Sequence, residues 1–178
     1  MKAPEQLETA RLALRRPRAG DVDAMFNRYT SDPEVTRYVG WPRHTSASDA
    51  QAFLAFSDAQ WESWPAGPYL AWSRTDGTLL GSSGLIFETP HRAATGYVFA
   101  TDAWGLGYAT ETLAAMVDVA RAAGVRRLYA LVHADHGASA RVLEKCGFDR
   151  EGTLRRYAEF PNLVPGEPQD VVCYATIL

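Results

Sequence analysis

The sequence predicts an α+β fold in which one mixed, mostly antiparallel sheet of about seven strands is flanked by about four helices on its two faces. Three observations predict this fold. The chain has 178 residues, which suits one domain over residues 1–178. Hydrophobic residues make up 47% of it, enough to build a core. Strand-like and helix-like segments also alternate in a mixed order, without repeats or linkers between them.

Turn-forming and capping residues bound the elements expected in the first third of the chain. These elements are a strand over 7–16, a short helix that Asp21 caps and that ends before residues 32–33, and a helix that begins near Ser46 or Ser48 and stops at Pro65. Residues 41–44, Trp-Pro-Arg-His, are expected to form a loop between the two helices.

Strand patterns dominate the middle of the chain. Turn signals separate strands expected at 69–73, 79–87 and 95–100, which predicts an antiparallel meander. The clearest helix follows over 108–123, where apolar residues recur at helical spacing and Gly124 supplies a stop. The remaining elements are a central strand at 127–133, a helix at 138–146, a strand that opens at Phe148 and a last strand at 171–177.

Charge and composition exclude several classes of protein. With 18 basic and 21 acidic residues the net charge is −3, which argues against an electrostatic nucleic-acid binder. No stretch approaches the roughly 20 apolar residues of a membrane span, and the first residues do not resemble a secretory leader. Cys146 and Cys173 are too few for a disulfide framework, so we expect a cytoplasmic protein with two free thiols.

Residues 103–111, Ala-Trp-Gly-Leu-Gly-Tyr-Ala-Thr-Glu, carry the most informative pattern for chemistry. Gly105 and Gly107 let the backbone approach a ligand, and the free N–H groups of the following helix start favour an anion such as phosphate. The loop lacks the lysine of a P-loop, and Thr110 occupies the place of the third glycine in a dinucleotide-binding fingerprint. Taken alone, the same pattern is also that of a plain helix-start turn.

Four blocks in register make the sequence resemble the GNAT superfamily of acyl-CoA N-acyltransferases. Within it, the closest likeness is to the branch that acetylates the N-terminal alanine of ribosomal proteins, the RimJ/RimL type. The resemblance begins with the Leu-Glu-Thr-Ala-Arg-Leu segment at Leu7 and continues to the last strand. Its blocks are residues 41–44, the Gly-Tyr-Val at 96–98, the Gly loop at 104–111 and the Val-Leu-Glu-Lys-Cys-Gly-Phe at 142–148.

The resemblance implies acetyl-CoA as the cosubstrate and assigns its binding residues. In the family, amides of the Gly loop and helix start bind the pyrophosphate, while the preceding strand pairs with the pantetheine arm. Carried over to this chain, the coenzyme-binding residues are Tyr97, Val98, Phe99, Trp104, Gly105, Leu106, Gly107, Tyr108, Ala109 and Thr110, with His136 and Ser139 after the central strand. Arg141 and Lys145 either reach the 3′-phosphate or form a solvated helix face.

The catalytic residues of the family are only partly present. The usual acid tyrosine and one branch's base glutamate fall at Leu143 and Leu131, which cannot transfer protons, and a frequent strand carboxylate falls at Thr95. An asparagine that contacts the coenzyme is replaced by His136. Some branches use a serine three residues further on as the acid for the thiolate, which is Ser139 here. Alternatively, Ser139 only caps or lines its helix turn.

The sequence does not identify the acceptor or the catalytic base. The acceptor is a small-molecule amine or a protein N-terminus; no nucleic acid or membrane partner is expected, and a homodimer is left open. Base candidates are Glu88, His91, Glu159 and Asp170, with proton loss to ordered water as the alternative. Trp41, His44, Trp61, Trp64 and Phe160 either wall an acceptor pocket or pack in the core.

The sequence predicts no metal site, and it favours one function over two alternatives. His133, Asp135 and His136 lie close together in sequence without a second pair of ligands, so we expect no metal. The leading function is acetyl transfer from acetyl-CoA to a primary amine by direct attack on the thioester. The alternatives are a non-catalytic acyl-CoA sensor or partner-binding module on the same fold and, more remotely, a dinucleotide-binding protein.

Overall fold

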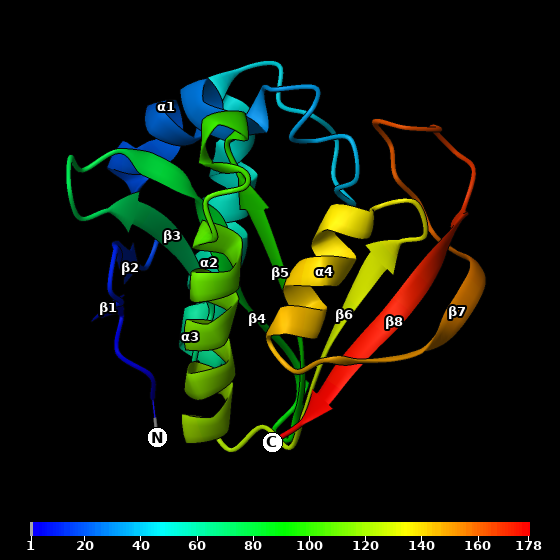
Figure 1. The fold of residues 1–178 in the computed structure, drawn as a ribbon. Helices are drawn as coiled ribbons and strands as arrows, with labels where there is room; N and C mark the ends of the chain where they lie inside the picture. The colour runs from blue at the N-terminus through cyan, green and yellow to red at the C-terminus, as the bar shows by residue number, and fades with distance from the viewer. Residues whose placement is uncertain (1) are drawn as a thin grey trace.

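Eight strands form one sheet in the order β1-β2-β3-β4-β5-β6-β8-β7 in the computed structural model, which describes residues 2–178 (Figure 1). The strands are β1 (Gln6–Glu8), β2 (Leu12–Arg15), β3 (Pro68–Ser73), β4 (Leu79–Thr89), β5 (Arg92–Phe99), β6 (Arg127–His133), β7 (Asp149–Ala158) and β8 (Gln169–Ile177). The helices are α1 (Val22–Met25), α2 (Ala50–Ser63), α3 (Tyr108–Ala122) and α4 (Gly137–Lys145). The expected α+β class is confirmed.

Helices cover both faces of the sheet, as expected. Figure 1 shows α3 in front of the sheet and α2 behind it. The cluster of buried residues on the α3 side includes Leu12 and Leu14 of β2 together with Leu113 and Met116 of α3. Met25 of α1 belongs to a second buried cluster on the other face, to which Phe53 of α2 also packs. The sheet is therefore sandwiched at its β2–β5 half, where burial is greatest.

The first expected strand is two strands. Residues 7–16 divide into β1 and β2, which pair antiparallel, with a tight turn at Thr9–Arg11. The Thr9 N–H donates to the Leu12 carbonyl at 2.8 Å and closes the turn. This hairpin raises the strand count from the expected seven to eight, because the apolar alternation at Leu12 and Leu14 marks only the second strand.

Asp21 occupies the expected N-cap position of α1, but its side chain makes no cap hydrogen bond there. Its carboxylate instead accepts the Arg18 N–H at 2.7 Å and the Arg15 guanidinium at 2.6 and 2.8 Å. These bonds close the turn that precedes α1. The α-helix itself lasts one turn and continues as a π-helical turn over Phe26–Thr30.

The middle and last elements match their predictions more closely. The β3-β4-β5 meander is antiparallel throughout, and α3 ends one residue before the predicted 108–123 limit. Gly124 follows it with a φ of 83°, a left-handed conformation that favours glycine. Among the strand pairs of residues 2–178, only β5–β6 is parallel. None of the helices described for residues 2–178 is long and apolar enough to cross a membrane.

Candidate active site

The sheet opens between β5 and β6. Antiparallel pairing with β4 accompanies β5 from Ala93 to Phe99, but pairing with β6 stops after Ala94↔Tyr129. Beyond that point the two strands diverge, as Figure 1 shows. Along residues 95–99, the edge of β5 that faces β6 therefore has no neighbouring strand among the described residues, although β5 is an interior strand of the sheet.

Two of the three predicted pantetheine-binding residues face this gap. The Ser83 hydroxyl of β4 donates to the Gly96 carbonyl at 2.8 Å, so the backbone groups of Gly96 face β4. Backbone groups alternate along a strand, which turns those of Val98 toward β4 and those of Tyr97 and Phe99 toward the gap. An extended ligand arm that contains amides can pair with this open edge as a strand would.

The Gly loop follows β5 directly. Gly105 and Gly107 have φ values of 73° and 82°, so both positions need the left-handed freedom of glycine. The indole Nε1 of Trp104 donates to the Phe99 carbonyl at 2.8 Å and fixes the start of the loop to the end of β5. Trp104 and Leu106 are 50% and 54% exposed, so the loop surface is accessible to a ligand.

The start of α3 presents free amides beside this loop. The first helical bond runs from the Glu111 N–H to the Gly107 carbonyl at 3.0 Å. The N–H groups of Tyr108, Ala109 and Thr110 precede it and have no partner within the helix. Together with the positive end of the helix dipole they form a site for an anion. The structure thus brings the predicted pyrophosphate-binding segment next to the open edge of β5.

Ser139 lies on α4 opposite β5. Its hydroxyl and its carbonyl are each 2.9 Å from the hydroxyl of Tyr97. The side chain does not cap α4, whose N-cap residue is His136 and has no side-chain cap bond. Ser139 therefore does not cap its helix, and the alternative that it only lines the helix turn stays a prediction. Instead the Ser139 hydroxyl contacts the Tyr97 phenol of β5.

His136 packs in an aromatic cluster at the end of β6. Its ring stacks on Tyr38 with 4.7 Å between centroids, and the same Tyr38 ring lies 4.9 Å from His133. The His133 ring meets Phe160 edge-on at 4.8 Å. Burial, together with repulsion from His133, lowers the pKa of His136 below its usual value, so the imidazole is neutral at pH 7. A neutral ring can donate one hydrogen bond, as the coenzyme assignment requires.

The five aromatic candidates for an acceptor pocket separate into two groups. Trp61 is buried in the core, where its Nε1 donates to the Pro68 carbonyl at 3.0 Å. Trp64 stacks on Phe87 in the same core, with 5.4 Å between ring centroids. For these two the packing alternative is correct. The other three lie on loops: Phe160 meets His133 at the end of β6, and Trp41 packs on His44 with 5.1 Å between ring centroids.

Two of the base candidates lie at the wrong end of the sheet. Glu88 and His91 flank the start of β5, whereas the Gly loop follows its end. The Tyr129 hydroxyl donates to the Glu88 carboxylate and lowers its pKa, which makes it a poor base as well. Asp170 lies at the start of β8, beside the end of β6, and its carboxylate accepts the Arg156 N–H at 2.8 Å. Glu159 is exposed on the loop after β7.

The remaining candidates are the two cysteines, the metal ligands and the two basic residues of α4. Both cysteines are free thiols, as expected, and burial raises the pKa of each. Within residues 2–178, no group of three His, Cys, Asp or Glu side chains is placed to hold a metal ion. Arg141 and Lys145 are exposed on α4.

Two residues that organise this end of the molecule could not be recognised from the sequence. Tyr38 is one, since nothing in its neighbourhood marks it as more than a loop residue. Asn162 is the other. Its Nδ2 donates to the carbonyls of Thr36 and Trp41 at 2.8 and 2.9 Å, and its Oδ1 accepts the Arg43 N–H at 2.7 Å. These bonds join two loops that lie more than a hundred residues apart in the chain.

Known proteins are similar to this chain in sequence. The model of the acetyltransferase (GNAT) domain matches residues 11–149. The uncharacterized N-acetyltransferase YoaA of Bacillus subtilis (strain 168) is 32% identical over 174 residues, which cover 96% of each chain. The uncharacterized N-acetyltransferase p20 of Bacillus licheniformis is 31% identical over 86% of this chain and 87% of its own.

Solved structures show the same fold at lower identity. RimL, a ribosomal L7/L12 α-N-protein acetyltransferase solved with coenzyme A, superposes with a TM-score of 0.85 at 22% identity, covering 98% of both chains. The microcin C7 self-immunity acetyltransferase MccE, solved with acetyl-CoA and AMP, gives 0.86 at 17% identity, covering 99% of this chain and 98% of its own. The expected fold, enzyme class and cosubstrate are thereby confirmed. The chain belongs to the GNAT family of acetyltransferases, which use acetyl-CoA.

Proposed function

We propose that this enzyme transfers the acetyl group of acetyl-CoA to a primary amine, on a small molecule or at a protein N-terminus, by direct attack on the thioester. The opening of β5 away from β6, directly beside the Gly loop and the start of α3, carries this proposal. We take residues 1–178 as one catalytic unit. Free thiols and the choice of cosubstrate support a cytoplasmic location.

The coenzyme would lie across the gap in an extended form. Its pyrophosphate binds the free amides of the segment 104–110. Its pantetheine arm pairs with the open backbone of Tyr97 and with the N–H of Phe99, whose carbonyl already accepts the Trp104 indole. This places the thioester near Ser139 and His136, which lie across the gap on α4 and at its N-cap. The assignment needs no basic side chain on the pyrophosphate, which agrees with the chain's net charge of −3.

Ser139 is the residue we assign to the leaving group. The neutral amine attacks the carbonyl carbon, the C–S bond breaks, and the developing oxyanion is stabilised by a backbone N–H of the open β5 edge. The thiolate takes a proton from the Ser139 hydroxyl, and the proton that the amine loses passes through water to the Ser139 oxygen. When Tyr97 donates to the Ser139 carbonyl, the serine hydroxyl keeps its own hydrogen for this transfer.

The amine would enter on the side of the joined loops. The loop of Tyr38 and Trp41 meets the loop of Phe160 and Asn162 at the end of β6, next to His136. The related structures named above act on a ribosomal protein N-terminus and in immunity to a microcin. One fold thus serves acceptors of different size, and these loops are where we expect acceptor choice to be made.

Replacing Asn162 with alanine should raise the KM for the amine by about tenfold, because the two loops lose the three bonds that join them. The affinity for acetyl-CoA should stay within about twofold, since Asn162 makes no contact with the coenzyme segments. Steady-state kinetics with varied amine and a coenzyme titration check both. Asn27→Ala, at the other and exposed asparagine, is the matched control. An unchanged amine KM in Asn162→Ala would contradict the acceptor assignment.

A single-turnover assay tests the proposed function itself. The wild-type enzyme is mixed with acetyl-CoA labelled in the acetyl group and with a panel of small amines, polyamines and peptides with free N-termini. Transfer of label to an amine of the panel, with release of free thiol, is the expected result. Tight coenzyme binding without transfer to any of them would favour the non-catalytic sensor, and no binding at millimolar acetyl-CoA would overturn the proposal.

A further inference from the structure

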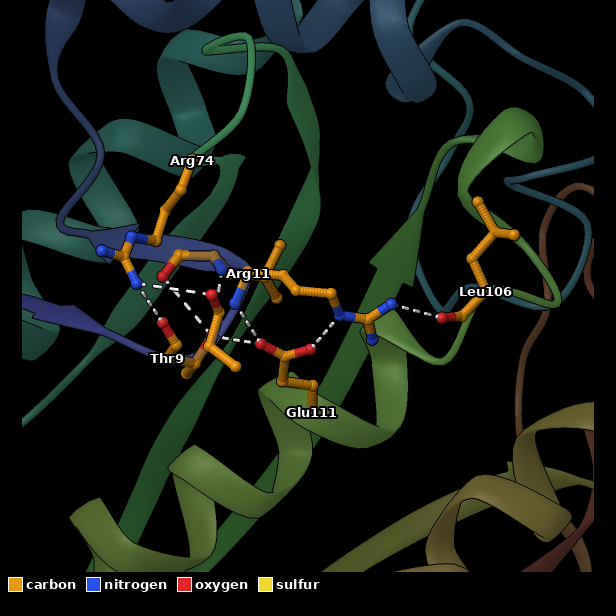
Figure 2. Close-up of polar contacts among 7 residues, drawn as sticks. Thr9, Arg11, Arg74, Leu106 and Glu111 are labelled. Atoms are coloured by element: carbon orange, nitrogen blue, oxygen red, sulfur yellow. Dashed lines mark hydrogen bonds and ion pairs between the residues drawn. The ribbon is translucent and has the colours of Figure 1, made fainter.

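Residues of the turn between β1 and β2 form hydrogen bonds with the first turn of α3. The Glu111 carboxylate accepts the Thr9 hydroxyl at 2.5 Å, the Arg11 N–H at 2.8 Å and the Arg11 Nε at 2.7 Å (Figure 2). Burial alone would raise the pKa of Glu111, but the hydrogen bonds from Thr9 and Arg11 outweigh it and hold the pKa below its usual value. Glu111 is therefore a fixed negative charge within the helix start.

Arg11 continues from Glu111 to the Gly loop. Its Nη1 donates to the Leu106 carbonyl at 2.8 Å, and its guanidinium lies 4.4 Å from the centre of the Tyr108 ring. Its Nη2 lies 3.4 Å from where a side chain on Gly107 would begin. Figure 2 shows this side chain extended between the carboxylate of Glu111 and the Leu106 carbonyl. One guanidinium thus contacts both residues that flank Gly107.

These contacts reduce two sources of repulsion that a bound anion would meet at this site. A carboxylate in the first turn of α3 lies close to the amides of Tyr108–Thr110 and would repel a phosphate there. Arg11 neutralises this charge and draws it toward the β1–β2 turn. A carbonyl within a phosphate-binding loop is also repulsive if it rotates inward. The bond from Arg11 holds the Leu106 carbonyl on the guanidinium and so opposes such a rotation.

We propose that Arg11, oriented by Glu111, is a positioning residue that holds the Gly loop in its pyrophosphate-binding conformation. The proposal rests on the proposed placement of acetyl-CoA. It adds a part of the N-terminal hairpin to the coenzyme site, although the hairpin lies about 100 residues before the loop in the sequence. Arg11 acts on the loop's backbone and on the charge of Glu111, and the pyrophosphate is still bound by the amides.

Calorimetric titration with acetyl-CoA tests the proposal on the full chain. Arg11→Ala should weaken binding by about tenfold, and Arg11→Lys should recover only part of it, because an ammonium cannot bridge the carboxylate and the carbonyl as a planar guanidinium does. Arg74→Ala is the matched control. Arg74 donates to the Thr9 carbonyl of the same turn at 2.8 Å, and its side chain is 45% exposed against 46% for Arg11. Its substitution should leave the affinity within about twofold.

A second ligand separates positioning from general loosening of the structure. S-acetylpantetheine has the thioester and the arm but no pyrophosphate, so its binding, followed by NMR, should be equal in wild type and Arg11→Ala. Adding Glu111→Gln to Arg11→Ala should restore part of the lost acetyl-CoA affinity, because the uncompensated charge is removed.

The outcomes are distinct. Wild-type affinity for acetyl-CoA in Arg11→Ala overturns the proposal, as does an equal loss in Arg74→Ala or an equal loss with S-acetylpantetheine. These results would leave the proposed function standing, because wild type would still bind acetyl-CoA. Failure of the wild-type chain to bind acetyl-CoA would instead overturn the proposed function, and the positioning role with it.

Discussion

Replacing Gly107 with valine should weaken acetyl-CoA binding by about 100-fold or more while the chain still folds. Gly107 is the N-cap residue of α3 and has a φ of 82°, which a β-branched residue adopts only with strain. The loop must therefore leave the conformation that aligns its amides. Isothermal titration with acetyl-CoA measures the loss, and thermal unfolding monitors the fold.

The other end of the same helix supplies the control. Gly124 has a φ of 83°, with no atom within 4 Å of where its side chain would begin. Gly124→Val carries a similar backbone strain at a distance from the Gly loop, so it should lower the melting temperature comparably and leave coenzyme affinity within about twofold. Coenzyme affinity in Gly107→Val equal to that in Gly124→Val would refute the placement of the pyrophosphate.

Ser139→Ala should lower kcat by about 100-fold without a large change in acetyl-CoA affinity, because the thiolate loses its proton donor. Ser139→Thr keeps the hydroxyl and should retain most of the activity. Tyr97→Phe removes the phenol that lies 2.9 Å from the Ser139 hydroxyl and carbonyl, and should give an intermediate loss. The measurement is kcat from steady-state assays beside the coenzyme Kd from titration.

The split between the two constants decides the role of Ser139. A loss of kcat at unchanged Kd supports proton donation. A loss of affinity at unchanged kcat would make Ser139 a coenzyme-binding residue only, and full activity in Ser139→Ala would remove it from the mechanism while leaving the enzyme assignment intact. Stability should change little, since the side chain does not cap α4.

Local periodicity made some elements predictable and left others hidden. α3 was predicted to within one residue because Leu113, Met116 and Ala120 repeat at helical spacing and are all buried. The β1–β2 turn was missed, because the pattern of Leu12 and Leu14 does not show where the preceding strand ends. A turn of this kind is fixed by its hydrogen bonds, including those to α3.

In the candidate site, too, some features can be predicted from the sequence and others cannot. The Gly loop can be located from the sequence, since its two glycines and the helix start are adjacent. The gap between β5 and β6 cannot, because the apolar content of a strand shows that it is interior and not where its pairing stops. Two of the base candidates were misplaced for a related reason: Glu88 and His91 lie near a strand end, but the sequence does not say which end of the sheet that is. Tyr38, Asn162 and Arg11 act through partners distant in the chain.

A crystal structure of the wild-type chain with coenzyme A tests the placement of the cosubstrate most directly. The pyrophosphate should accept hydrogen bonds from amides of the segment 104–110, with the pantetheine arm paired to the backbone of Tyr97 and Phe99 and its sulfur near Ser139. A pyrophosphate bound away from the Gly loop, or an arm that leaves the β5 edge unpaired, would contradict it.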